Sequence, residues 1–174
     1  MSATPFNVLF LCTGNSARSI LAEALLDQLG AGRYRAYSAG SQPRGAVHPQ
    51  ALETLRAAGV PVAGLRSKSW DEFEQAGAPT MDCIITVCDN AAGETCPVWL
   101  GHPLVAHWGM ADPAAVEGEA AQQAAFAATL AGLRQRIEAL LSLPIAGLEP
   151  AALQAALRTI GRMPGATAGV FAHD

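Results

Sequence analysis

The sequence predicts an α/β fold in which helices flank a doubly wound, four-stranded parallel sheet. Short apolar runs, such as residues 7–11 and 83–87, are typical of parallel strands, which are buried on both faces. Segments with helical periodicity separate these runs, and strands that alternate with helices favour a parallel sheet with right-handed connections. The chain has 174 residues, 51% of them hydrophobic, so it can bury a core of its own.

The first half of the chain supplies two strands and two helices. Residues 7–11 form the first strand. A helix over residues 20–29 follows, because its apolar side chains recur at core spacing before a glycine ends it. A second strand covers residues 34–38. After a loop rich in Gly and Pro, Pro49 begins the second helix at its first turn, and Gly59 ends it.

The second half contains a brief helical turn at residues 70–73, a buried third strand at residues 83–87 and a fourth strand at residues 103–107. The Asp112-Pro113 pair is predicted to open the last long helix, because proline suits the first helical position. Apolar residues recur every three or four positions in this helix and form one face. Its members are Phe126, Leu130, Leu133, Ile137 and Leu140.

A further segment follows this long helix. Pro144 and Gly147 interrupt the chain, and Pro150 begins a short helix that Gly161 ends. This helix either packs on its own domain or contacts a second copy of the chain. We expect residues 143–174 to form a helical extension with a tail.

Composition excludes several classes of protein. The formal net charge is −4 without a cluster of Lys and Arg, so nucleic acid and anionic membranes are poor partners. The sequence has no run of about 18 apolar residues, so it predicts no membrane span. The first residues do not resemble a signal peptide, and we therefore expect a cytoplasmic protein. The four cysteines lack paired C-x₂-C spacing, which favours redox or catalytic roles over a metal site.

The most informative stretch is CTGNSARS at residues 12–19, between the first strand and the first helix. We call residues 12–18 the cysteine loop. A helix N-terminus offers free N–H groups and positive potential, and successive inward N–H groups form a nest for an oxyanion. Arg18 adds a planar guanidinium that can bind two oxygens at once. The positive potential of the helix N-terminus predicts a lowered pKa for Cys12. The alternative is a buried cysteine beside a surface arginine.

This octet, with its flanking strand and helix, resembles the low-molecular-weight protein tyrosine phosphatase superfamily, and more narrowly its arsenate reductase branch. The resemblance covers roughly residues 7–142. It implies the strand order 2-1-3-4, a phosphatase-like catalytic domain at residues 1–142, and a ligand site at the carboxyl end of the first strand. Tyrosine phosphatases of this type usually carry a second cysteine where Ala17 stands and an aromatic residue where Ala114 stands. Both departures favour the reductase over the phosphatase, and a site without an aromatic wall suits a small inorganic oxyanion.

The resemblance assigns roles to single residues. Cys12 is the nucleophile, Ser19 donates its hydroxyl to the Cys12 thiolate, and Asp112 is the general acid that protonates a leaving oxygen. Asp112 also suits a simple helix cap. The residues expected to bind the oxyanion are Thr13, Gly14, Asn15, Ser16, Ala17 and Arg18.

A second group of residues, between Cys88 and Cys96, resembles the redox segment of arsenate reductases. By this resemblance, Cys88 would attack the sulfur of Cys12 to form a disulfide, and Cys96 would then attack Cys88 and move the disulfide to the surface. The spacing is one residue longer than the family's better-known one, and the alternative is a strand-end cysteine followed by a loop cysteine. Cys83 is expected to be inert core.

The resemblance implies reduction of arsenate to arsenite for arsenic detoxification, with phosphate or sulfate as mimics of the substrate. It implies no tightly bound cofactor and an external thiol reductant, either thioredoxin or glutaredoxin with glutathione. A low-molecular-weight phosphatase and a non-enzymatic oxyanion or thiol sensor are the alternatives.

Some relatives bind potassium near the loop through Asn, Glu, Ser and Asp. Asn15, Glu23 and Ser38 match the first three, but Lys68 stands at the fourth position. A fixed ammonium at this place could replace the ion, and the alternative is a solvated lysine on the surface.

Overall fold

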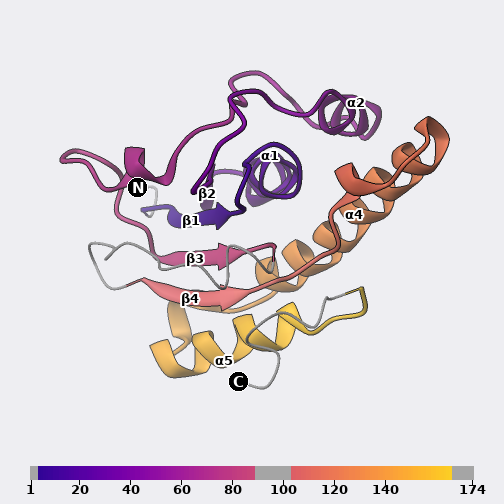
Figure 1. The fold of residues 1–174 in the computed structure, drawn as a ribbon. Coiled ribbons are helices and arrows are strands. Elements are labelled where there is room, and N and C mark those ends of the chain that lie inside the picture. The colour runs from indigo at the N-terminus through magenta and orange to yellow at the C-terminus, as the bar shows by residue number, and fades with distance from the viewer. Residues whose placement is uncertain (1–3, 89–102, 166–174) are drawn as a thin grey trace.

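The computed structural model describes residues 4–88 and 103–165. Four strands form one sheet in the order β2-β1-β3-β4, and every neighbouring pair is parallel (Figure 1). The strands are β1 (Phe6–Leu11), β2 (Tyr34–Ala39), β3 (Cys83–Thr86) and β4 (Leu104–His107). The predicted fold class and strand order are therefore confirmed.

The helices fall close to their predicted positions. They are α1 (Arg18–Gly30), α2 (Pro49–Ala57), α4 (Glu119–Leu141) and α5 (Pro150–Gly161). The described residues also contain three short 3₁₀ turns: η1 (Trp70–Phe73), η2 (Pro113–Ala115) and η3 (Ile145–Gly147). Helix α1 begins two residues earlier than predicted, so Arg18 is its first residue and the cysteine loop runs directly into it.

The prediction that Asp112-Pro113 opens the long helix is wrong. These residues begin η2, where the Asp112 carboxylate accepts a hydrogen bond from the backbone N–H of Ala114. Val116 is already extended, and Gly118, with φ of 90°, turns the chain into α4 at Glu119. Since that φ lies in a region that favours glycine, the helix start depends on Gly118 and not on the proline.

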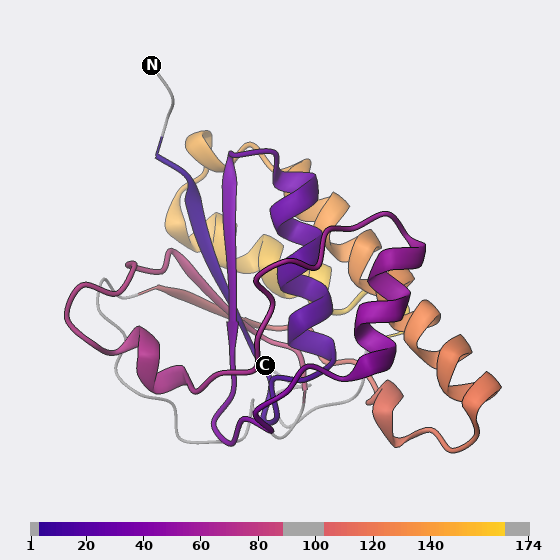
Figure 2. The same cartoon turned by 90° about the horizontal axis from the view of Figure 1, so that it is seen from above.

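The two faces of the sheet are covered differently. Val8 and Phe10 of β1 belong to a large core with the helices, whereas Leu9 and Leu11 belong to a smaller cluster on the opposite face. The smaller cluster is completed by side chains that include those of η1. Figure 2 shows η1 on one side of the strands and α1, α2 and α4 on the other.

Helix α5 packs on its own sheet, against β4 and α4. Its buried residues include Leu157, whose backbone carbonyl accepts a hydrogen bond of 3.0 Å from Trp108 Nε1. Gly161 lies so close to β4 that a Cβ there would be 2.3 Å from the carbonyl oxygen of His107. Packing on the domain is thus the interpretation of this helix that the structure supports.

None of the helices in residues 4–88 and 103–165 combines the length and hydropathy that a bilayer crossing requires.

Candidate active site

The cysteine loop leaves β1 at the carboxyl edge of the sheet and ends at the first turn of α1. Ala17 precedes the helix and provides no side-chain cap, so the first N–H groups of α1 have no side-chain acceptor from that position. Asn15 takes a left-handed conformation with φ of 43°, which turns the chain sharply. A short turn that feeds an uncapped helix N-terminus is suited to an anion.

The segment after β2 holds this loop from outside. Three of its backbone N–H groups donate to carbonyl oxygens of the loop at 2.9–3.0 Å. The pairs are Gln42 with Thr13, Arg44 with Gly14, and His48 with Ser16. Carbonyls that are engaged on the outside leave the amide edge of the loop free to face an anion. These positions were not singled out in the sequence, because backbone hydrogen bonds leave no side-chain signature.

Arg18 lies at the start of α1 and reaches across to the chain after β4. Its Nη1 donates to the carbonyl of Met110 at 2.8 Å, and its Nη2 lies 3.8 Å from Asp112 Oδ2. Its Nε is buried and has no hydrogen-bond partner within the described parts of the chain. A buried guanidinium donor without an acceptor is well suited to bind an oxyanion.

Asp112 is both a cap and a neighbour of the loop. One carboxylate oxygen caps η2, and the other lies next to the Arg18 guanidinium. Its side chain is 34% exposed, so it can exchange protons with water. The two interpretations of this residue are therefore compatible, and the structure brings it to the arginine of the loop.

Cys12 and Cys88 lie together at the ends of β1 and β3, and both are buried. The backbone N–H of Thr13 points to Cys88 Sγ at 3.4 Å, and the Thr13 hydroxyl lies 3.7 Å from the same sulfur. The side chain of Thr13 thus contacts Cys88, and the sequence analysis did not predict this contact.

The pKa of Cys12 is raised, mainly by its hydrogen bond to Cys88 and further by burial, although Arg18 and the backbone N–H of Gly14 act in the opposite direction. The predicted lowering of this pKa is therefore wrong for this arrangement. Two adjacent buried sulfurs cannot both carry a charge, and the backbone N–H of Thr13 is directed to Cys88 and not to Cys12.

The remaining two cysteines of the sequence are Cys83 and Cys96. Cys83 is fully buried at the start of β3, and burial raises the pKa of its thiol, as expected for inert core. Cys96, the predicted last member of the relay, lies outside the described residues.

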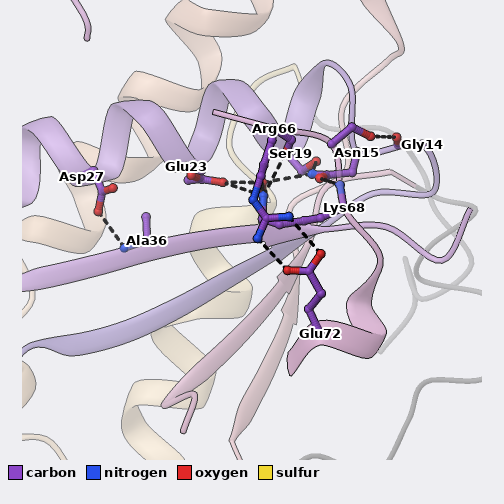
Figure 3. A network of polar contacts seen from close by, with 11 residues as sticks. Gly14, Asn15, Ser19, Glu23, Asp27, Ala36, Arg66, Lys68 and Glu72 are labelled. Carbon is purple, nitrogen blue, oxygen red and sulfur yellow. Dashed lines mark hydrogen bonds and ion pairs between the residues drawn. The ribbon is translucent and has the colours of Figure 1, made fainter. Parts of the chain in front are cut away.

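A buried polar network supports the loop from the side of α1 (Figure 3). Asn15 Nδ2 donates to the hydroxyls of Ser19 at 2.8 Å and Ser38 at 3.0 Å, and its Oδ1 accepts from the backbone N–H of Lys68 at 2.9 Å. Among the described residues, no hydrogen bond joins Ser19 to Cys12. The structure thus places Ser19 in the network that shapes the loop.

The ammonium of Lys68 completes this network. It lies 3.5 Å from Glu23 Oε1 and 3.4 Å from the Ser38 hydroxyl, and it donates to the carbonyl of Arg66 at 2.9 Å. Burial raises the pKa of Glu23 and lowers that of Lys68, while their mutual attraction opposes both shifts. The amine therefore occupies the position among Asn15, Glu23 and Ser38 that the sequence predicted for it.

Within residues 4–88 and 103–165, no group of three or more His, Cys, Asp or Glu side chains is arranged to hold a metal ion.

Known proteins resemble this chain in sequence and in fold. Residues 7–156 match the family described as Low molecular weight phosphotyrosine protein phosphatase. The arsenate reductase of Bacillus licheniformis is 35% identical over 119 residues, which are 68% of this chain and 82% of that protein.

Two solved structures extend the comparison. One, described as an arsenate reductase in the phosphate binding state, superposes with a TM-score of 0.61 at 26% identity and covers 79% of this chain and 97% of its own. The thioredoxin-dependent arsenate reductase of Corynebacterium glutamicum superposes with a TM-score of 0.58 at 25% identity and covers 80% of this chain and 62% of its own. Because the family match spans most of the chain, and the strand order and cysteine loop agree with it, the chain belongs to the low molecular weight phosphotyrosine protein phosphatase family.

Proposed function

We propose that the protein reduces arsenate to arsenite by thiol chemistry. The observation that carries this proposal is the second buried thiol, Cys88, in contact with Cys12 beside the unpaired Nε of Arg18. Hydrolysis of a phosphate ester needs one sulfur, whereas a two-electron reduction by thiols needs two sulfurs that can form a disulfide. The matched relatives named above as arsenate reductases support the same reaction.

In the first step, arsenate lies in the cysteine loop, with the loop N–H groups and Arg18 as its donors. The Cys12 thiol passes its proton to an oxygen of the arsenate dianion, and the resulting thiolate attacks the arsenic. An As–O bond breaks, and Asp112 gives a proton to the departing oxygen, which leaves as water. The product is a thioester-like Cys12–arsenate adduct in which arsenic remains As(V).

In the second step, the Cys88 thiolate attacks the sulfur of Cys12. A Cys12–Cys88 disulfide forms, the S–As bond breaks, and its electron pair stays on arsenic. Arsenic is thereby reduced from As(V) to As(III) and leaves as arsenite after protonation. The two thiols supply both electrons. The backbone N–H of Thr13 supports this step because it stabilises negative charge on Cys88.

We further propose that Cys96 attacks Cys88, frees Cys12 and carries the disulfide to the surface. An external dithiol, thioredoxin or glutaredoxin with glutathione, then restores the thiols. An intact helix would hold positions 88 and 96 about 12 Å apart, at 1.5 Å per residue, so this exchange requires a different conformation of the segment. A thiol-recycled enzyme of this kind belongs in a reducing compartment, which is the basis for a cytoplasmic location.

A low-molecular-weight phosphatase is the second candidate, because the same loop would accept a phosphate ester. Ala17 and Ala114 weigh against it, since neither a second loop cysteine nor an aromatic wall is present at those positions. Ala114 lies in η2, directly beside Asp112.

The decisive experiment mixes the reduced protein with arsenate in the absence of any reductant. About one equivalent of arsenite should appear, together with a disulfide mapped by mass spectrometry. Cys88→Ser should release none, and Cys96→Ser should release one equivalent and stop at Cys12–Cys88. Turnover should then require thioredoxin or glutaredoxin.

Absence of arsenite from the wild type, together with hydrolysis of an aryl phosphate, would favour the phosphatase. Binding of arsenate without either product would favour a sensor. Normal turnover of Cys96→Ser with thioredoxin would leave the reductase but remove Cys96 from the relay.

A further inference from the structure

Arg44 lies against the outer side of the cysteine loop. Its backbone N–H donates to the carbonyl of Gly14 at 3.0 Å, and its side chain runs over the same glycine. A Cβ at Gly14 would be 3.0 Å from Arg44 Nε and 3.3 Å from its Cγ. Position 14 therefore accommodates the arginine because it is a glycine, and the guanidinium is held beside the loop.

Two further hydrogen bonds hold the segment around Arg44 against the cysteine loop. The Gly14 carbonyl also accepts a hydrogen bond of 3.2 Å from the Ser67 hydroxyl, which itself accepts one from the N–H of Gly45 at 3.2 Å. Arg44 is thus anchored to the loop by its own N–H and by the residue that follows it.

The charge of Arg44 is not neutralised within the described parts of the chain. No carboxylate there lies within 4 Å of its guanidinium, whereas Arg66 pairs with Glu72 at 2.6 Å and Arg56 with Glu53 at 3.8 Å. Arg44 is also exposed. A cation without a carboxylate partner among the described residues is therefore fixed at the rim of a loop that already contains the half-buried Arg18.

We propose that Arg44 is a specificity-determining residue that attracts a doubly charged oxyanion to the cysteine loop. This inference rests on the proposed function and names a second cation of the same site. Because Arg44 is exposed, water and salt screen its charge, so it acts on capture of the anion and not on bond making. If about 8 Å of water separates the guanidinium from a bound dianion, their attraction strengthens binding of the anion roughly threefold to tenfold.

The test compares Arg44→Gln, Arg44→Lys and the control Arg33→Gln at low ionic strength. Arg33 is exposed and precedes β2, so it lies near the amino edge of the sheet, about 20 Å from the loop at ~3.3 Å per residue. Both Gln variants change the net charge equally. Arg44→Gln should raise the KM for arsenate roughly threefold to tenfold with kcat nearly unchanged. Arg44→Lys should retain most of the affinity, and about 1 M salt should abolish the difference.

Calorimetric titration with inorganic phosphate gives a second readout that needs no turnover, and Arg44→Gln should weaken that binding by the same factor. Unchanged phosphate binding, an equal effect of Arg33→Gln, or a change confined to the KM for thioredoxin would each overturn the proposal. If the wild type produces no arsenite, the proposed reduction fails, while the phosphate titration still decides whether Arg44 attracts an oxyanion.

Discussion

Cys12 and Cys88 occupy similar depths but have different neighbours. Cys12 lies near the Arg18 guanidinium and the backbone N–H of Gly14, whereas Cys88 accepts from the backbone N–H of Thr13 and lies next to the Thr13 hydroxyl. Because the two thiols are hydrogen-bonded to each other, the loss of a proton from one changes the pKa of the other. The identity of the attacking sulfur is therefore decided by protonation as well as by position.

Cys88→Ser should lower the pKa of Cys12, because the hydrogen bond to Cys88 is the largest cause of its elevation. A serine hydroxyl donates a hydrogen bond but does not ionise near neutral pH, so it favours the Cys12 thiolate. Thiolate formation, followed by ultraviolet absorbance or by the alkylation rate of Cys12, should begin at lower pH in the variant than in the wild type. Superimposable titrations would show that the two sulfurs are not coupled.

Asp112→Asn should slow arsenate reduction by roughly 10²–10⁴, the usual contribution of a positioned general acid. It should change stability little, because asparagine also caps helical turns. Asp112→Ala removes both roles and should additionally lower the free energy of unfolding by about 1 kcal/mol. Rapid-mixing kinetics and urea denaturation separate the two effects. A normal rate in the Asn variant would limit Asp112 to the cap.

Potassium should not stabilise the wild type, because the Lys68 ammonium already lies between Glu23 and Ser38. Lys68→Asp should be less stable in sodium buffer, since two carboxylates then share a buried site. Potassium should restore part of the loss. Melting temperatures in matched sodium and potassium buffers test this. A rise of several degrees for the wild type in potassium would mean that the ion and the amine do not compete.

At the scale of elements, the end of β2 determines the shape of the cysteine loop. Gly40 follows β2 and pairs on its other side with Ser69, while its own backbone lies against the loop. Two segments that are distant in sequence thus enclose residues 12–18. The loop has little room to move as a result, which is a condition for a preorganised anion site.

Gly40→Ala should impair the site, because a Cβ there would be 2.4 Å from the carbonyl oxygen of Thr13 and 2.6 Å from that of Cys12. Backbone must shift to relieve such contacts, and overpacking of this kind destabilises by about 1–3 kcal/mol. Phosphate binding and arsenate reduction should both fall at least tenfold if the loop moves by about 1 Å. Gly147→Ala is the control, since its Cβ would meet nothing within 4 Å. Equal activity of the two variants would show that the loop tolerates displacement.

At the scale of the whole molecule, α5 ties the end of the described chain to the site. It packs on β4, and the chain from β4 leads through Trp108 and Met110 to Asp112. The Arg18 guanidinium contacts this same chain at the carbonyl of Met110. Asp112, the proposed general acid, thus follows a strand that helix α5 covers.

Leu157→Ala should therefore destabilise the fold by about 2–5 kcal/mol, the usual effect of truncating a buried leucine. Trp108 should report the change by fluorescence, because its indole N–H is bonded to the carbonyl of Leu157. Val105→Ala is the matched control on β4, since that side chain is 49% exposed. Chemical denaturation measures both variants. A loss below about 1 kcal/mol for Leu157→Ala would mean that α5 contributes little to the fold.

Much of the molecule follows from the sequence alone. Apolar runs and helical periodicity located the strands and helices, because burial depends on residue type and spacing. The octet at residues 12–19 indicated the anion loop, because its chemistry is carried by consecutive residues. Lys68 was placed correctly as the amine of the buried network.

Tertiary structure decided what depends on contacts between distant segments. The raised pKa of Cys12 arises mainly from Cys88, 76 residues away, and the backbone N–H of Thr13 is directed to that second sulfur. The start of α4 depends on the backbone angle of Gly118, which composition does not specify. The support of the loop by residues 40–48 consists of backbone hydrogen bonds, which nearly any side chain permits. Local pattern predicts elements and motifs, whereas protonation and loop shape require the fold that brings their partners together.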